Sequence, residues 1–512
     1  MQAVKRLAYR RCAAFLAALL TALVAAPRHA FSEARAAGCG LPQAAFCENF
    51  ESGPAAVSDR GRGNELSRTR FSASRYAPSL STGDGETFWA WEGELGMMDG
   101  EPDVCRPGLP TFFLPSTDTL VCEPNATIGS RYLLGIVGSQ NYGSNGYRIR
   151  QPFDFANRTG RIVFDADLSN DPILLGYLSV TIAEDPTPTP SWDLNGRGPN
   201  PRNGLMIVFV SSTIDVHDVR DQAMTTLSGP VSTPPSQRGH LSRVELRLSR
   251  TALEVLTSEP SPDGLTFGAV VSRRSVTFPQ PLTFTRGYVT LVGHNHATWK
   301  YAITYAGLPR PMPSWNTYWD NIGFDGPAIT NTREYEIPDA GIPSNETTID
   351  EHPPGTFTTV LHHGLSLGYT IPDGENATGA PLTFSNVSMA GATRARLVFN
   401  GYYQGHDNNE QLRLGNGRLR YRINDHPRHD RAFTPGEIAM LDEPGQTGGF
   451  NHSFDIPLSE LHDGDNSVRF STLNIESGYP NAVVNLDLLI DFDPDPVFFD
   501  SFELPGRQDS SR

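Results

Sequence analysis

Hydrophobic and polar residues alternate along this chain in short runs, and Gly, Pro, Asn and Asp separate the runs. In residues 161–168, for example, Ile162, Phe164 and Ala166 share one face of an extended chain. Residues 205–210 are apolar throughout, as expected of a strand that is covered on both faces. No stretch of useful length after the N-terminal segment has the helical period. The pattern predicts an all-β protein, with further strands at 243–248, 287–296 and 319–324.

A second group of strands is expected after a change in composition. Residues 328–356 are rich in Thr, Asn, Glu, Asp and Pro, which is typical of a linker. Further strands are expected at 395–399, 419–423, 450–456, 468–473 and 483–492. The sequence therefore predicts two β-sandwich (jelly-roll) domains, at 37–327 and 357–494, joined by the linker at 328–356 and followed by a C-terminal tail at 495–512.

The first 36 residues have the features of an export signal. Basic residues such as Lys5 and Arg11 precede an apolar, uncharged run at 12–26, and Ala34-Arg35-Ala36 is a cleavage site of the A-x-A type. The apolar run is too short for a good membrane span. We therefore expect residues 1–36 to be removed and the protein to be secreted or periplasmic, without a stable membrane anchor.

The charge of the chain limits its partners. The formal net charge is −16 at pH 7. Nucleic acids and anionic lipid surfaces bind clusters of Lys and Arg, and the overall acidity argues against both as partners.

Four cysteines remain once Cys12 leaves with the signal, and an even number in an exported protein indicates disulfides. Three connectivities are possible, and we favour the local pairs Cys39–Cys47 and Cys105–Cys122. Their spacings match no zinc-binding pattern.

Five segments of the first domain resemble the concanavalin A-like lectin/glucanase (laminin-G-like) sandwiches of exported bacterial proteins. They are FCENFESG at 46–53, RIRQPFDFANRTGRIVFDADL at 148–168, RVELRLSRTALEV at 243–255, FTRGYVTLVGHNHATWK at 284–300 and YWDNIGFDGP at 318–327. The resemblance implies that the first and last strands lie side by side. It also implies a structural Ca²⁺ at their edge, held by Glu51 and Asp320, with Glu48 as a further candidate. The alternative is that these carboxylates are solvated or hydrogen-bonded locally.

The second domain is similar to a smaller galactose-binding-like jelly roll, through FDIPLSELHDGDNSVRF at 454–470. Such modules often accompany glycan-active enzymes. The larger fold hosts lectins, hydrolases, lyases and adhesion modules, so fold alone does not fix the activity.

Aromatic residues supply candidate glycan-binding positions. Trp89 and Trp91 are two residues apart and would share one face of a strand, beside acidic residues that can hold sugar hydroxyls. Trp192 and Trp299 are similar candidates. Burial in the core is the alternative for all four.

One strand carries the best candidate for catalysis. Tyr288, His294 and His296 share a strand face, and Arg286 flanks it. A polysaccharide lyase needs a base such as His or Tyr and a cation that neutralises a uronate carboxylate. The alternative is a polar outer face of a sandwich strand. The paired-carboxylate string E-x-D-x-x-E, which is typical of retaining glycosidases on this fold, is absent from the sequence.

Two functions follow from these observations. The first is an exported bacterial protein that binds glycans or a cell-surface or matrix polysaccharide without cleaving them. The second is a polysaccharide-degrading enzyme, a lyase before a glycoside hydrolase, acting through a groove of the first sandwich. An adhesion protein that binds other proteins is a third possibility.

Overall fold

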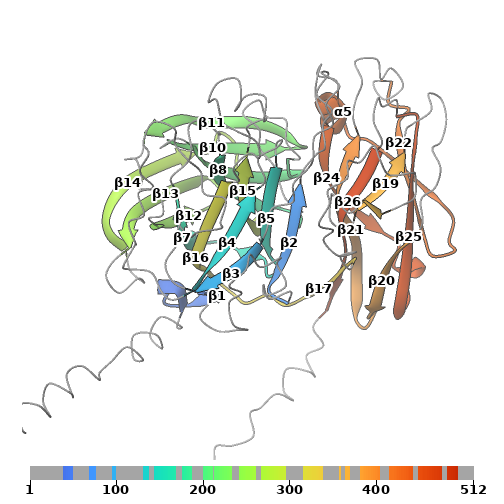
Figure 1. Ribbon diagram of the computed structural model, residues 1–512, viewed down its shortest axis with the longest axis horizontal. Coiled ribbons are helices and arrows are strands. Elements are labelled where there is room, and N and C mark those ends of the chain that lie inside the picture. The colour runs from blue at the N-terminus through green and yellow to red at the C-terminus, as the bar shows by residue number, and fades with distance from the viewer. Residues whose placement is uncertain are drawn as a thin grey trace, which may run out of the picture.

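The chain folds into two β-sandwiches that stand side by side (Figure 1). The computed structural model describes residues 38–49, 69–76, 95–99, 131–137, 143–168, 176–186, 200–210, 213–232, 241–260, 267–295, 315–337, 357–358, 364–368, 381–403, 414–441, 448–475 and 481–493. The predicted all-β fold with two sandwich domains is confirmed. Among the described residues, no helix is both long enough and apolar enough to cross a membrane.

Two antiparallel sheets form the first sandwich. Sheet I has the order β14 (Phe267–Thr277), β13 (Ala252–Pro260), β12 (Leu241–Leu248), β7 (Gly160–Asp167), β16 (Trp315–Asp325), β4 (Arg131–Val137) and β3 (Leu95–Asp99), with β1 (Ala44–Glu48) paired to β16. Sheet II has the order β11 (Ala223–Ser232), β10 (Thr213–Arg220), β9 (Asn203–Val210), β8 (Gly176–Ala183), β15 (Arg286–Asn295), β5 (Gly143–Ile149) and β2 (Phe71–Tyr76), with β6 (Phe153–Asp154) paired to β15. A short 3₁₀ turn, η1 (Gly38–Gly40), precedes β1.

Two further sheets form the second sandwich. Sheet III has the order β18 (Phe357–Thr358), β19 (Gly364–Gly368), β26 (Asn481–Phe492), β21 (Ala392–Tyr403) and β24 (Gly448–Ile456), with β17 (Thr332–Glu336) paired to β26. Sheet IV has the order β20 (Leu382–Val387), β25 (Gly464–Leu473), β22 (Arg418–Ile423) and β23 (His429–Ala432). One α-helix, α5 (Pro435–Leu441), and a 3₁₀ turn, η4 (Leu458–Glu460), also belong to this half of the chain.

The alternation of hydrophobic and polar residues determines which side chains form the cores of the sandwiches. Ile162, Phe164 and Ala166 point between sheets I and II and are buried there. In β9, Leu205, Ile207 and Phe209 join the same core, whereas Met206 and Val208 form a separate buried cluster with Val219. The strand is therefore covered on both faces, as its unbroken apolar sequence predicted.

Strand β17 lies within the stretch that was expected to be a linker. Thr332–Glu336 pairs with β26 and so adds an edge strand to sheet III. The sequence Thr-Arg-Glu-Tyr-Glu has no apolar run, and for that reason the hydrophobic pattern gave no strand there. Residues 338–356 and the predicted tail at 495–512 lie outside the described residues.

The motifs at the two ends of the first sandwich pair with each other. Strand β1 runs antiparallel to β16, with Cys47 opposite Gly323 and Phe46 opposite Phe324. The two phenylalanine rings stack with their centroids 5.4 Å apart. A Cβ atom on Gly323 would lie 3.0 Å from the Cβ of Cys39, so a glycine lets the N-terminal segment pack flat on β16. This arrangement is the adjacency that the resemblance implied.

A disulfide joins Cys39 to Cys47, the local pairing that we favoured. Cys39 and Leu41 are buried against Val163, and Cys39 O accepts a hydrogen bond from Arg243. Cys105 and Cys122 lie outside the described residues.

Removing this disulfide with Cys39→Ser and Cys47→Ser should destabilise the first sandwich by about 2–3 kcal/mol, because a short loop is freed in the unfolded chain. Thermal unfolding of the oxidised protein and of the double variant measures the difference. An unchanged melting temperature would contradict a structural role for the N-terminal segment.

Candidate functional site

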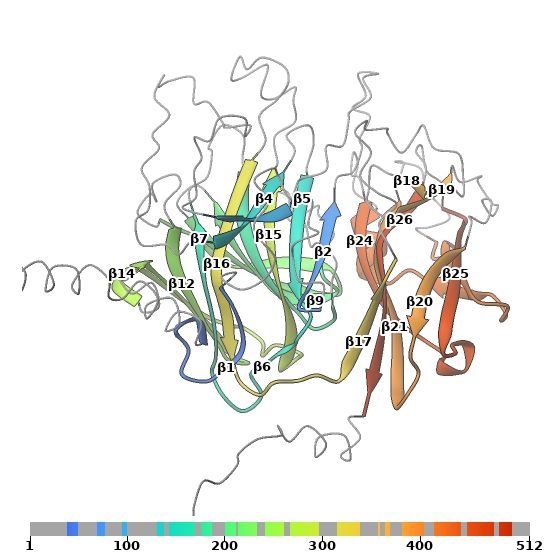
Figure 2. The ribbon, with the colours of Figure 1, turned by 60° about the horizontal axis from the view of Figure 1, so that its bottom comes forward.

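The two sandwiches meet through sheet II and sheet III, and charged side chains fill the contact. Figure 2 shows β17 on the side of the second sandwich that faces the first. Arg148 in β5 lies on the face of sheet II opposite the core, because Tyr147 and Ile149 on either side point into the core. Its guanidinium donates to both carboxylate oxygens of Glu334, at 3.0 and 2.5 Å, and to Asp487 Oδ2 at 3.2 Å.

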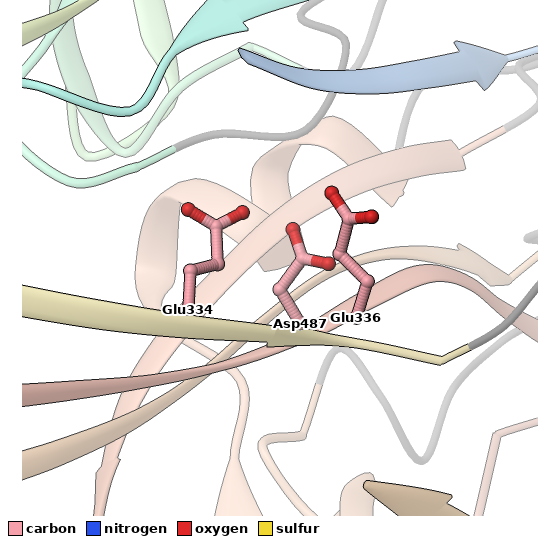
Figure 3. A group of neighbouring side chains, drawn as sticks. All are labelled: Glu334, Glu336 and Asp487. Carbon is pink, nitrogen blue, oxygen red and sulfur yellow. The ribbon is translucent and has the colours of Figure 1, made fainter. Parts of the chain in front are cut away.

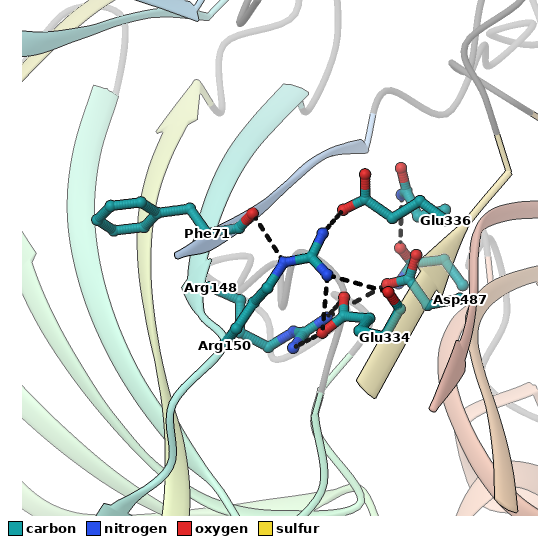
Figure 4. A network of polar contacts seen from close by, with 8 residues as sticks. Phe71, Arg148, Arg150, Glu334, Glu336 and Asp487 are labelled. Carbon is teal, nitrogen blue, oxygen red and sulfur yellow. Dashed lines mark hydrogen bonds and ion pairs between the residues drawn. The ribbon is translucent and has the colours of Figure 1, made fainter. Parts of the chain in front are cut away.

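Arg150 extends the same network along the strand edge. Its Nη2 donates to Glu336 Oε1 at 2.6 Å, and its Nη1 donates to the backbone carbonyl of Glu334 at 3.3 Å. We call Arg148, Arg150, Glu334, Glu336 and Asp487 the interface network (Figure 4). Only 1% of the Arg148 side chain and 4% of the Glu334 side chain are exposed, so these ions depend on each other for stabilisation.

Burial and charge separate the pKa values of two carboxyl groups in the network. Burial raises the pKa of Asp487, and the nearby charges of Glu334 and Glu336 raise it further, to well above its ordinary value. Burial also acts to raise the pKa of Glu334, but Arg148 and Arg150 outweigh it and hold that pKa below its ordinary value. Asp487 therefore keeps its proton to higher pH than Glu334 does.

A second contact lies at the start of helix α5. Thr434 and Glu437 form a capping box, in which each side chain accepts from the backbone N–H of the other residue, at 3.2 and 2.8 Å. Gln222, in the turn before β11, donates to Glu437 Oε1 at 3.1 Å, and Gly436 N donates to Asp221 Oδ2 at 3.1 Å. A Cβ atom on Gly436 would lie 1.8 Å from the carbonyl oxygen of Asp221, so the two backbones touch there.

Arg396 makes a third polar contact between the two sandwiches. Arg396 in β21 is 4% exposed, donates to Asp185 Oδ1 at 3.2 Å and also pairs with Asp491 of its own sandwich at 3.0 Å. Polar contacts from three separate places, on β17 and β26, on helix α5 and on β21, therefore hold the second sandwich against the first.

A cleft of about 840 Å³ opens beside the network, between β1 and β17. We call it the interdomain cleft. Its walls combine guanidinium, carboxylate, amide, hydroxyl and aromatic groups: Phe46, Arg70, Arg150 and Gln151 from the first sandwich, and Thr330, Thr332, Arg333, Glu334, Tyr335, Glu336 and Ser385 from the second. Its volume is within the range of ligand pockets, and pockets often lie between domains.

Side chains in the cleft are fixed by their own contacts. Arg70 binds Glu48 and the carbonyl of Cys47, and its guanidinium lies 4.6 Å from the centre of the Phe46 ring. The hydroxyl of Tyr335 accepts a hydrogen bond from Ser388 N at 2.8 Å. The walls of the cleft are therefore largely preformed.

Within the network, the side chains of Glu334 and Asp487 are almost fully buried and bonded to Arg148. Oxygens of Glu334, Glu336 and Asp487 lie within 4.8 Å of one another, and Figure 3 shows the three side chains on the same side of β17 and β26. Divergent pKa values in such a group resemble an acid and base pair. However, Asp487 is 3% exposed and Glu334 is bound by Arg148. The two arginines also supply the positive charge that a metal ion would bring to this cluster.

The predicted catalytic strand face is covered. Tyr288 is 5% exposed, with the Arg148 guanidinium 6.0 Å from the centre of its ring, and His294 is 1% exposed and hydrogen-bonded to Ser179 at 2.9 Å. Arg286 is exposed and pairs with Asp154 at 3.4 Å. His296 lies outside the described residues. We expected this face either to line a groove or to meet solvent, but Tyr288 and His294 are buried, and at Arg148 the second sandwich covers the face.

The calcium prediction gains no support from the residues that are described. Asp320 is 1% exposed, and its carboxylate accepts from the backbone and side-chain nitrogens of Asn321, at 2.7 and 3.1 Å. Asp165, directly opposite, accepts from Asn321 and Arg243. Glu48 pairs with Arg70. Glu51 and the predicted glycan-binding residues Trp89, Trp91, Trp192 and Trp299 lie outside the described residues.

Sequence reasoning missed the interface network, although the signal was present. Arg148 and Arg150 in RIR, and Glu334 and Glu336 in REYE, alternate with the period of a strand and have opposite charges. Two charged stripes of opposite sign on strands from different domains indicate a contact between the domains.

Comparisons with known proteins give distant similarities. No protein-family model and no curated protein matches the chain. The chain is similar to the exoplasmic/lumenal domain of VIP36 in a form bound to Ca²⁺ and Man3GlcNAc, with 13% identity and a TM-score of 0.26 over 39% of this chain and 79% of that one.

Two further solved structures are similar over part of this chain. Carbohydrate-binding module CBM66 from Bacillus subtilis has 6% identity and a TM-score of 0.22, covering 38% of this chain and 86% of its own. A family 16 endo-glucanase from Bacteroides ovatus has 10% identity and a TM-score of 0.32, covering 55% of this chain and 99% of its own. Carbohydrate-binding proteins and a glycoside hydrolase are thus among the similar structures, while the sandwich fold itself rests on the sheet topology above.

The raised pKa of Asp487 predicts that the stability of the protein depends on pH through the interface network. A raised pKa in the folded state stabilises the fold below the unfolded value of about 4, and this stabilisation is lost as pH rises through the folded value. Asp487→Asn keeps a neutral side chain at every pH. The variant and the wild type should melt close together at about pH 4, near the unfolded value, and the variant should melt higher by a few degrees at pH 8.

Melting curves at the two pH values test this prediction, with the exposed Asp455→Asn as the control for a changed net charge. The same difference between variant and wild type at both pH values would show that Asp487 does not titrate as described.

Proposed function

We propose that this protein is exported and binds a glycan without cleaving it, and that the interdomain cleft holds the glycan. The observation that carries the proposal is the composition of the cleft walls. Arginine and carboxylate forks, an amide and several hydroxyl groups can pair with the many hydroxyl groups of a sugar, and aromatic rings can pack on its C–H faces.

Contacts within the protein already hold the cleft side chains in place, which favours ligand binding without a rearrangement of the site. Arg150 and Glu336 are held by each other, and Arg70 is held by the β1 backbone. A ligand that pairs with preformed groups loses less free energy to ordering side chains on binding.

A non-catalytic role is favoured over the polysaccharide lyase or hydrolase. Within the described part of the chain, the residues proposed for lyase chemistry are either buried, as Tyr288 and His294 are, or paired at a different position, as Arg286 is. The carboxylates beside the cleft are neutralised by arginines. Calcium bound at Glu51 and Asp320 stays a prediction that is separate from this proposal.

Blocking the cleft with a bulky side chain tests the proposal. Ser385 is exposed in β20 and lines the cleft, so Ser385→Trp should fill the space without removing a buried contact. Binding of the protein to a polysaccharide array should fall by about tenfold or more, which corresponds to the loss of one good polar contact.

Thr383→Trp is the matched control, because Thr383 is exposed two residues earlier on the same strand and does not line the cleft. It should bind as the wild type does. Equal binding by both Trp variants would remove the cleft as the site. Release of reducing or unsaturated sugar ends by the wild type would contradict a non-catalytic function.

A further inference from the structure

Sheet IV carries a second cavity, far from the interdomain cleft. Figure 1 places β22 and β25 on the side of the second sandwich that faces away from the first. The cavity has a volume of about 490 Å³, and its lining includes Arg420, Arg422, Arg428, Arg469, His426 and Asp425. We call it the arginine groove.

Strand alternation places the arginines on one face. Leu419, Tyr421 and Ile423 of β22 are buried in the core of the second sandwich, so Arg420 and Arg422 point outward. In β25, Val468 and Phe470 are buried and Arg469 between them is exposed. The outer face of two adjacent strands is therefore basic.

Two of these arginines lie directly opposite each other. Arg422 pairs in register with Arg469 across the antiparallel strands. Like charges at directly opposed positions destabilise a sheet. Both residues are on the outer face of sheet IV and line the groove.

The hairpin loop after β22 completes the groove. Arg422 Nε donates to the carbonyl of His426 at 2.9 Å, and its Nη2 donates to the carbonyl of Asp425 at 3.2 Å. These bonds fold the loop back over the strands, so that His426 and Arg428 join the lining. The backbone of this loop thus places the side chains of His426 and Arg428 beside the arginines of the two strands.

The charge of the groove is opposite to that of the chain. Four arginines and one aspartate line it, and Asp430 lies beside it, 3.0 Å from Arg420 and 3.9 Å from Arg428. The local excess of positive charge remains after both acidic residues are counted, in a protein whose net charge is −16. The net charge of the protein does not attract an anion, so an anionic partner would be drawn to the local positive charge of the groove.

We propose that the arginine groove binds the acidic groups of a polysaccharide, either uronate carboxylates or sulfate esters. Guanidinium groups bind both kinds of anion through paired N–H donors, and two opposed arginines suit a polymer that repeats its charge. This inference rests on the proposed function in taking a glycan as the ligand, but it uses a separate site.

Affinity electrophoresis of the full-length mature protein tests the inference with three polymers: alginate for carboxylates, dextran sulfate for sulfate esters and unmodified dextran as the neutral reference. The wild type should be retarded by at least one of the acidic polymers, and added NaCl should weaken the retardation. The double variant Arg422→Gln/Arg469→Gln should lose about tenfold or more of that affinity, since two charge-assisted contacts are removed.

The matched control is Arg286→Gln/Arg394→Gln, which removes the same charge at two exposed arginines outside the groove. It should bind as the wild type does. The melting curve of the groove variant should show that it remains folded at the temperature of the binding assay.

Retardation by alginate alone or by dextran sulfate alone supports the inference and identifies the acidic group. Equal losses in the groove and control variants would overturn it, since the effect would then be one of net charge. Retardation by single-stranded DNA as strong as that by the acidic polysaccharides would also overturn it. Binding to neutral glycans through the cleft, with no difference between the groove variant and the wild type, would leave the proposed function standing and remove only this inference.

Discussion

The ion pair between Arg148 and Glu334 determines how the two halves of this protein relate. Arg148 belongs to sheet II and Glu334 to sheet III, and both side chains are almost fully buried. A charge removed from water in this way is stable only while its partner is present, and the loss of one partner costs about 3–5 kcal/mol. The interface network therefore favours one orientation of the sandwiches over a loose contact.

That orientation decides which surfaces remain available. The outer face of sheet II at Arg148 is covered, and Tyr288 is buried on the same face. The edge beside the network stays open as the interdomain cleft, and the outer face of sheet IV stays open as the arginine groove. The two proposals place glycan contacts at these two surfaces.

Much of the fold could be predicted from the sequence, because the alternation of hydrophobic and polar residues along a strand reports on local burial. The inward residues of β7 and the two-sided burial of β9 follow from this alternation. The pairing of β1 with β16 was implied by the resemblance to known sandwiches. The position of the site could not be predicted in the same way. A polar strand face usually meets solvent, so the outer face of β15 was expected to be exposed or to line a groove. Tyr288 and His294 on that face are buried instead. Strand β17 was missed because a charged strand that faces another domain has no apolar run and therefore has the composition of a solvated linker. Such contacts depend on residues far apart in the sequence, as Arg148 and Asp487 are.

The central claim is that Arg148 and Glu334 stabilise the structure as a pair. A double-mutant cycle with Arg148→Met and Glu334→Leu, followed by chemical unfolding of the whole protein, tests it most directly. Each single variant should be destabilised by about 3–5 kcal/mol, and the double variant by much less than the sum, because it leaves neither member of the pair buried alone. Additivity within about 0.5 kcal/mol would contradict the account.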